Sequence, residues 1–244
     1  MTVRINCWSG PRNVSTALMR SFSQRPDTKV FDEPLYGNYL LKTGAPHPAR
    51  DELIEVLETD ATLVIDKVIL GPNETGVVFF KQMVHHLLDD LDLAFLDECL
   101  NVLLVRDPAE VIASLVHQLP EPTMLDVGMQ RQVELLRDLL DRGQEPPVLD
   151  ARELLLVPKG VLRELCERLG IEWYESMLSW AQGPHPEDGA WAPHWYENLY
   201  RSTGFAPYKP SDKVVPDECL PLLEECRVLY EELKRSAIVS SKVA

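Results

Sequence analysis

The sequence is poor in basic residues. It has 24 Lys and Arg against 39 Asp and Glu, which gives a net charge of −15 over 244 residues. A negative field of this size repels nucleic acids and highly sulfated or phosphorylated polymers, so we expect neither as a partner. A small anion can still bind where the local charge is positive.

Cysteines are few and show no metal-binding or redox spacing. There are five, at positions 7, 99, 166, 219 and 226, with no Cys-x-x-Cys pair, and most lie within apolar patterns. This pattern indicates buried, reduced thiols rather than disulfides. No group of His, Cys, Asp and Glu has the spacing of metal ligands, so we expect no bound metal.

Long apolar runs are also absent. No stretch is long enough to span a membrane, and no basic region followed by an apolar run opens the chain. The sequence therefore predicts a cytoplasmic protein that has no membrane partner. It leaves the oligomeric state open, with a homodimer as one alternative.

Apolar strand-like segments alternate with amphipathic helix-like segments along the chain. Strands are predicted at residues 3–8, 28–31, 77–80, 101–105 and 148–150. Helices are predicted at residues 17–22, 35–41, 52–57, 60–70, 109–116, 127–140, 158–169 and 220–233, and the tail after them is expected to fray. The alternation predicts an α/β fold with three layers, α/β/α, around a mostly parallel sheet, in a single domain over residues 1–244.

A polar turn joins the first predicted strand to the first helix, and it runs Ser9-Gly10-Pro11-Arg12-Asn13-Val14-Ser15-Thr16. A strand, a small polar turn and a helix form the layout of a phosphate-binding loop, because N–H groups at a helix start attract an anion. Ser15 and Thr16 add hydroxyl donors, and Arg12 adds a fixed cation. The loop lacks the Gly-Lys-Ser/Thr ending of a Walker A motif. An ordinary strand-to-helix turn remains the alternative.

Charged side chains follow the next three strands. Asp32-Glu33-Pro34 follows the second strand, Lys81 follows the third and Arg106 follows the fourth. Ligands of α/β sheets bind at the carboxyl ends of the strands, so these are candidate site residues. Arg106 is a natural phosphate ligand, and Ser114 lies about two helical turns beyond it. A solvated acid that caps the next helix is the alternative for Glu33.

Two further segments are candidates for binding a substrate. His85 and His86 follow Lys81 and are expected to open a helix, where neighbouring side chains do not face each other, so a metal pair is not predicted. Residues 183–205 form a long irregular segment, which is typical of a lid or binding loop. Its aromatic and histidine residues include Trp191, His194 and Trp195. An aromatic wrap over the core is the alternative.

The turn at residues 11–18 resembles the phosphosulfate-binding loop of sulfotransferases, which commonly reads Pro-Lys or Pro-Arg and then Ser/Thr-Gly-Ser/Thr-Thr. Residues 105–108 with Ser114 resemble the 3′-phosphate site of that family. Residues 148–171 are similar to a late family segment made of a short strand, an acidic-Leu pair, a proline and a helix that ends in Leu-Gly. The segments WSGPRN, DEP and WAPHWY resemble a bacterial sulfotransferase-like subgroup.

The resemblance implies a P-loop NTPase-like sulfotransferase fold that binds 3′-phosphoadenosine 5′-phosphosulfate as co-substrate. The implied reaction moves a sulfuryl group to a hydroxyl or amine of a small-molecule acceptor. Arg12 would contact the 5′-phosphosulfate, and Arg106 and Ser114 would hold the 3′-phosphate. The whole implied donor site is Gly10, Pro11, Arg12, Asn13, Val14, Ser15, Thr16, Arg106 and Ser114.

Some branches of the family place a catalytic Glu after the second strand, and Glu33 matches that position. We therefore predict Glu33 as the proton acceptor, with His85 as second choice. Arg12 and Lys81 are predicted to stabilise the charge that develops during transfer. The predicted acceptor site is Glu33, His86, Trp191, His194 and Trp195, beneath residues 183–205. The net charge favours a neutral or cationic acceptor.

The sequence departs from the family pattern at three places. Val14 stands where the loop usually has Gly, Met83 stands in place of a catalytic His, and no Arg-Lys-Gly occurs near the C-terminus. Two alternative functions therefore stay open. One is a P-loop-type small-molecule kinase that uses ATP, and the other is a non-catalytic nucleotide- or metabolite-binding protein.

Overall fold

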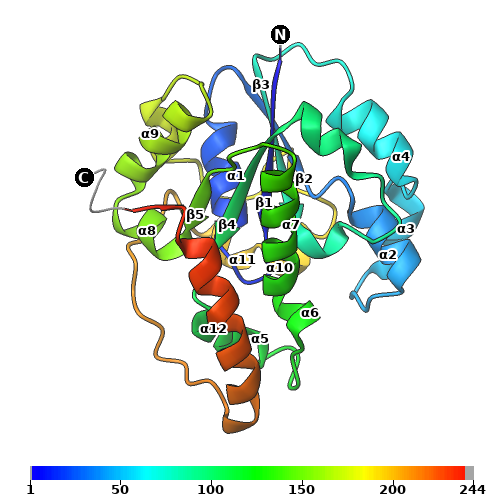
Figure 1. Ribbon diagram of the computed structural model, residues 1–244. Coiled ribbons are helices and arrows are strands. Elements are labelled where there is room, and N and C mark those ends of the chain that lie inside the picture. The colour runs from blue at the N-terminus through cyan, green and yellow to red at the C-terminus, as the bar shows by residue number, and fades with distance from the viewer. Residues whose placement is uncertain (1, 240–244) are drawn as a thin grey trace.

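The strand segments form one six-stranded sheet in the computed structural model, which describes residues 2–239 (Figure 1). The strand order is β2-β3-β1-β4-β5-β6, and every neighbouring pair is parallel. The strands are β1 Val3–Ser9, β2 Thr28–Asp32, β3 Val77–Met83, β4 Leu100–Val105, β5 Val148–Asp150 and β6 Ala237–Ile238. The prediction of a mostly parallel sheet is confirmed.

Helices connect successive strands and cover both faces of the sheet. The first group is α1 Ser15–Ser23, α2 Tyr36–Thr43, α3 Arg50–Val56, α4 Ala61–Val64, α5 Pro108–Leu115 and α6 Met124–Val127. The second group is α7 Met129–Asp141, α8 Ala151–Leu156, α9 Pro158–Arg168, α10 Ala192–Trp195, α11 Glu197–Tyr200 and α12 Leu220–Lys234. Within residues 2–239, no helix combines the length and the apolar character that crossing a membrane requires.

Side chains of the central strand β1 alternate between two separate hydrophobic cores, one on each face of the sheet. Ile5 and Cys7 of β1 pack with buried residues of α1 and α9 on one face. Trp8 points to the other face, where α5, α7 and α12 supply buried side chains. Since both faces are covered, most strand residues are apolar and buried on both faces, as in parallel sheets generally. This arrangement confirms the predicted three layers, and all five cysteines are buried in it.

The C-terminal tail corrects one expectation. Ala237–Ile238 adds β6 to the edge of the sheet, beside β5, instead of fraying. Residues 240–244, to which the same expectation applied, lie outside the described residues. The pairing was hidden in the sequence because a two-residue strand carries almost no periodic signal.

Two helical expectations also need correction. The helix predicted at residues 127–140 begins instead at Met129 as α7, because Gly128 is left-handed and separates it from α6. His85 and His86 do not open a long helix. They lie in a single 3-10 turn, Val84–His86, that follows β3 directly. Strand β3 itself continues through Lys81 to Met83, further than predicted.

Candidate functional site

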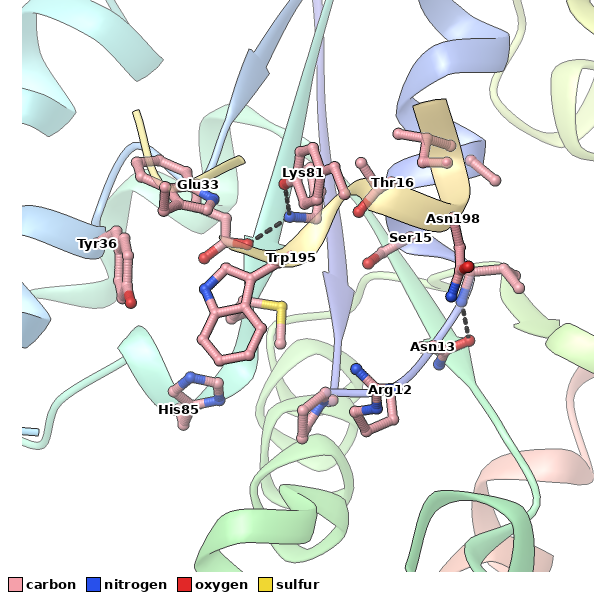
Figure 2. A pocket seen from close by; sticks show the side chains of 18 of the residues that line it. Arg12, Asn13, Ser15, Thr16, Glu33, Tyr36, Lys81, His85, Trp195 and Asn198 are labelled. Carbon is pink, nitrogen blue, oxygen red and sulfur yellow. Dashed lines mark hydrogen bonds and ion pairs between the residues drawn. The ribbon is translucent and has the colours of Figure 1, made fainter. Parts of the chain in front are cut away.

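A cavity of about 630 Å³ lies at the carboxyl edge of the sheet, where β1, β2 and β3 end. Its lining brings together residues 10–17, the ends of β2 and β3, helix α2 and the segment 191–206. Figure 2 shows Ser15 and Thr16 on one side of this cavity and Glu33 and His85 on the other. We call these two sides the donor end and the acceptor end.

The donor end contains the start of α1. The first helical hydrogen bond runs from the Leu18 N–H to the Val14 carbonyl, at 3.0 Å. The N–H groups of Ser15, Thr16 and Ala17 therefore have no helical acceptor. Val14 contributes no side-chain cap, and the first turn has no acidic residue. Ser15 and Thr16 hydroxyls also have no partner among residues 2–239. An uncapped helix start of this kind is a site for an anion.

Asn13 fixes the shape of the loop that precedes α1. Its side-chain amide donates to the Leu104 carbonyl of β4 at 2.9 Å, and its Oδ1 accepts the Val14 N–H at 2.8 Å. We expected this side chain to hold oxygens of a ligand, but its hydrogen bonds are used inside the protein. Gly10 packs closely against α6, because a Cβ there would lie 2.8 Å from the Val127 carbonyl oxygen.

Arg12 is the exposed cation of the donor end. Its backbone has a φ of 56°, and its Nε donates to the Ser114 hydroxyl at 2.9 Å. Burial of the guanidinium, and then the charge of Arg106, lower the pKa of Arg12. Because two arginines lie close together here, an anion at this end would be stabilised.

The predicted pair Arg106 and Ser114 is not brought together as a pair. Ser114 contacts Arg12, whereas Arg106 donates to the Arg12 carbonyl at 2.7 Å and to the Glu110 carboxylate at 2.8 Å. Neither Arg106 nor Ser114 lines the cavity. Both nevertheless contact Arg12, so they lie beside the donor end.

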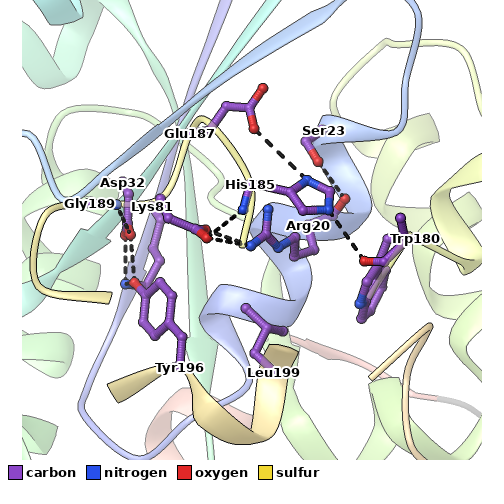
Figure 3. A network of polar contacts seen from close by, with 12 residues as sticks. Arg20, Ser23, Asp32, Lys81, Trp180, His185, Glu187, Gly189, Tyr196 and Leu199 are labelled. Atoms are coloured by element: carbon purple, nitrogen blue, oxygen red, sulfur yellow. Dashed lines mark hydrogen bonds and ion pairs between the residues drawn. The ribbon is translucent and has the colours of Figure 1, made fainter. Parts of the chain in front are cut away.

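Lys81 lies in a buried polar cluster at the acceptor end. Its Nζ donates to Asp32 Oδ1 at 2.8 Å, to Glu33 and to the Tyr196 hydroxyl at 2.9 Å. The Tyr196 hydroxyl donates in turn to Asp32 Oδ2 at 2.6 Å, as Figure 3 shows. Burial alone would lower the pKa of Lys81, but the charges of Asp32 and Glu33 raise it well above its usual value. Two carboxylates already balance the charge of Lys81, so the predicted role of Lys81 in stabilising charge during transfer stays a prediction.

Glu33 lies between this cluster and the cavity. It has a φ of 46°, and its N–H donates to the Lys81 carbonyl at 2.8 Å. Burial raises the pKa of Glu33, while Lys81 opposes that shift. The second carboxylate oxygen lies 3.8 Å from Nε2 of His86. Glu33 is therefore a carboxylate in the cavity wall that is readier to take a proton than an exposed one.

The two adjacent histidines are neutral at neutral pH. Burial lowers the pKa of His85 to about 4. Burial, together with the charges of His85 and Lys81, lowers the pKa of His86 well below its usual value. Neither ring nitrogen of His86 has a hydrogen-bond partner in the described part of the chain. Both histidines line the cavity, so they add polar but uncharged surface to its acceptor end.

Several of residues 183–205 line the cavity, but not every residue predicted there does. Trp191 and Trp195 line the cavity. His194 does not, because its ring packs against His47 at a centroid distance of 5.5 Å. Sequence reasoning missed Tyr36, Tyr39, His47 and Tyr196, which also line the cavity. Spacing could have indicated the two tyrosines of α2, since residues three apart share a helix face.

A buried ion pair ties this segment to α1. Asp188 accepts from Arg20 at 2.7 Å through both carboxylate oxygens, and both side chains are almost fully buried. The neighbouring Gly189 N–H donates to Asp32 Oδ2 at 3.1 Å. Figure 3 shows Gly189 beside Asp32, and Arg20 on α1. They attach the segment to the elements that carry both ends of the cavity.

Comparison with known proteins gives a family match and similar curated proteins. The family model described as a sulfotransferase domain matches residues 3–237. The Arabidopsis thaliana protein named branched-chain-amino-acid aminotransferase-like protein 2 is 38% identical over 242 residues, which cover 97% of this chain and 43% of that protein. The chain therefore spans less than half the length of this relative.

Two solved structures share the fold. A sulfotransferase domain from the curacin biosynthetic pathway aligns with a TM-score of 0.53 and 17% identity, over 93% of this chain and 98% of that chain. A sulfotransferase from Alicyclobacillus acidocaldarius aligns with a TM-score of 0.55 and 14% identity, over 96% of this chain and 95% of that chain. At these identities the likeness establishes the fold alone.

Proposed function

This chain belongs to the sulfotransferase domain family, and on that premise we propose that it moves a sulfuryl group from 3′-phosphoadenosine 5′-phosphosulfate to a hydroxyl or amine of a small-molecule acceptor. The donor would supply the sulfuryl group and a good leaving phosphate. The protein would supply charge, position and a proton acceptor. The observation that carries the proposal is that one cavity joins an anion-binding helix start to a buried carboxylate.

The donor end supports binding of a phosphosulfate. Ser15, Thr16 and Ala17, whose N–H groups have no helical acceptor, line the cavity, as does Arg12. Such a set holds the oxygens of a doubly charged anion through charge-assisted hydrogen bonds. Val14 stands in place of the usual Gly. Its N–H donates to Asn13 Oδ1, so it is not one of the N–H groups that we propose to bind the anion.

Arg106 and Ser114 remain our proposed ligands for the 3′-phosphate. The support is their shared neighbour, since both contact Arg12 at the donor end. ATP lacks a 3′-phosphate, so this pair favours the sulfotransferase over the kinase alternative.

Glu33 is the proposed proton acceptor. Its carboxylate lines the cavity, and burial raises its pKa toward the range in which a general base works well. Lys81 would hold this carboxylate in place and limit the rise of its pKa. His85, the second choice, lines the cavity too, but a pKa of about 4 makes it a weaker base.

Calorimetric titration with 3′-phosphoadenosine 5′-phosphate tests the donor site. We expect micromolar binding, and Arg12→Ala should weaken it by about 10- to 100-fold, which corresponds to losing hydrogen bonds to a charged group. Arg137→Ala is the matched control, because Arg137 is exposed and pairs with Glu232 away from the cavity. Binding of ATP with magnesium alone would favour a kinase. Binding of neither nucleotide would contradict the proposal.

A turnover assay tests the enzyme itself. The protein with the sulfated donor and a panel of small alcohols and amines should release 3′-phosphoadenosine 5′-phosphate in step with sulfated product. Donor binding without turnover of any acceptor would instead support the non-catalytic alternative.

A further inference from the structure

The acceptor end of the cavity is a box of rings. Tyr36 contacts Trp191 at a centroid distance of 4.8 Å and His86 at 5.0 Å. Tyr39 contacts His85 at 5.0 Å. The rings come from three separate parts of the chain. Besides Phe205, the rings that line the cavity are Tyr36, Tyr39, His47, His85, His86, Trp191, Trp195 and Tyr196. We call this set the aromatic box.

Trp195 gives the box a free aromatic face. Its side chain is 43% exposed although it lines the cavity, so much of its ring surface is uncovered. Its indole N–H donates to Nε2 of His47 at 2.9 Å, which holds the ring in one orientation. Figure 2 shows Trp195 between Lys81 and His85, in front of the cavity. A large apolar ring held in place and left uncovered is poised to contact a ligand.

The charge around the box is negative. Among the residues that line the cavity, the cations are Arg12, at the donor end, and Lys81. Lys81 is already balanced by Asp32 and Glu33, and Asp126 adds a further carboxylate to the lining. The histidines of the box add no positive charge, since burial lowers the pKa values of His85 and His86. A cation would thus meet aromatic faces and an excess of carboxylates.

We propose that the acceptor is a small alcohol that carries a quaternary ammonium group, and that the aromatic box binds this group. The proposal rests on the proposed sulfotransferase function and names its substrate class. The faces of Trp and Tyr rings attract cations, because the ring quadrupole is negative there. A quaternary ammonium has no N–H to donate, so such faces suit it. A quaternary nitrogen has no lone pair, so the hydroxyl is the group that takes the sulfuryl.

Glu33 lines the same cavity as the aromatic box and lies 3.8 Å from Nε2 of His86, so its carboxylate is close to an alcohol held there. In the transfer, the hydroxyl oxygen forms a bond to sulfur, and Glu33 takes its proton. The bond from sulfur to the donor's phosphate oxygen breaks, and its electron pair stays on that phosphate. The step uses no oxidant or further reactant.

Choline and its carbon isostere 3,3-dimethylbutan-1-ol test the proposal, because they differ in charge but hardly in shape. We would measure binding of each by calorimetry, with and without 3′-phosphoadenosine 5′-phosphate, and then kcat/KM for transfer to each. The wild-type protein should prefer choline by about 10-fold or more, the size of a desolvated cation–π contact. Trp195→Leu should abolish that preference, and Trp195→Phe, which keeps a ring face, should retain most of it.

The outcomes separate this inference from the function on which it rests. Equal binding of the two alcohols, or an unchanged preference in Trp195→Leu, would overturn the aromatic box as a cation site, even if both alcohols are sulfated. Preferred binding of choline with no donor binding and no transfer would leave the box and overturn the proposed function. Loss of the preference in Trp195→Phe as well would show that a ring face at position 195 is not what selects the cation, which also overturns it.

Discussion

Backbone strain marks the two residues on which the proposed chemistry depends. Within residues 2–239, Arg12 and Glu33 are the non-glycine residues with positive φ, at 56° and 46°. A left-handed conformation costs an L-residue about 1–2 kcal/mol. In each case a hydrogen bond holds the residue, from Arg12 to Ser114 and from the Glu33 N–H to the Lys81 carbonyl. Strain of this kind at both ends of one cavity is typical of functional sites.

The first prediction concerns Glu33 as proton acceptor. Glu33→Gln should lower kcat by about 100-fold or more, since the amide keeps the shape but accepts no proton. Affinity for 3′-phosphoadenosine 5′-phosphate should not change. The wild-type rate should also fall as the pH drops through the raised pKa of Glu33, because only the carboxylate is active.

The matched control is Glu231→Gln, an exposed carboxylate on α12. Full turnover in Glu33→Gln, or the same acidic limb in its rate profile, would remove Glu33 from the mechanism.

The second prediction concerns the close approach at Gly10. In Gly10→Ala, the new Cβ would lie 2.8 Å from the Val127 carbonyl oxygen, so the loop or α6 must move. We expect a loss of about 1–3 kcal/mol in the free energy of unfolding and weaker donor binding. Gly76→Ala is the control, because a Cβ there meets nothing closer than 3.8 Å. Equal urea midpoints for the two variants would contradict the packing argument.

At the scale of elements, the segment over the acceptor end is held by polar contacts and by a small core of its own. Trp191 and Tyr196 pack with Leu40 of α2 and Leu53 of α3. The Arg20–Asp188 pair attaches the same segment to α1. The aromatic box therefore depends on how one irregular segment packs against α1, α2 and α3.

The third prediction tests that attachment. Asp188→Asn leaves the Arg20 guanidinium buried without a counter-charge, which should lower the free energy of unfolding by about 3–5 kcal/mol. Glu187→Gln is the control, because that neighbouring side chain is 38% exposed and has no contact with Arg20. Urea unfolding measures both. If the two variants unfold alike, the buried pair does not anchor the segment.

At the scale of the whole molecule, charge is unevenly divided. The chain carries a net charge of −15, yet the donor end presents Arg12 beside Arg106 and an uncapped helix start. The sheet explains the contrast, because parallel strands bring their carboxyl ends to one edge, where the following loops and helix starts meet. The proposed anionic donor would therefore meet local positive charge at one end of the cavity, although the protein as a whole is acidic.

The fourth prediction follows from the buried histidines. Burial lowers the pKa of His85 from 6.5 to about 4 in the folded state, so between these pH values the unfolded state binds more protons. The contribution of neutral His85 to the free energy of unfolding is therefore full above about pH 6.5 and is lost as the pH falls toward 4. His85 should account for about 2 kcal/mol of the decrease in unfolding free energy between pH 7 and pH 5.

Urea unfolding of the wild type and of His85→Gln at both pH values measures this share. The variant should lose less stability on acidification than the wild type. Parallel decreases in the two proteins would show that His85 is not protonated on unfolding in this range.

The sequence by itself determined the three layers, the parallel sheet and the loop at the donor end. These features are local or periodic, since the strands are apolar runs and the loop is one continuous stretch of eight residues, Ser9 to Thr16. The same reading also singled out Glu33, Trp191 and Trp195, which line the cavity.

Only the tertiary structure decided the partners of these residues. The sequence shows Lys81 as a cation without showing its partners. In the structure Asp32 balances its charge, because β2 and β3 pair in register with Asp32 opposite Lys81. Asn13 is drawn into the protein by a carbonyl on β4, which is 91 residues away in the chain. The aromatic box likewise brings together residues 36–47, the turn after β3 and residues 191–196. Contacts between distant segments leave no pattern in any one of them, so they exist only once the chain has folded.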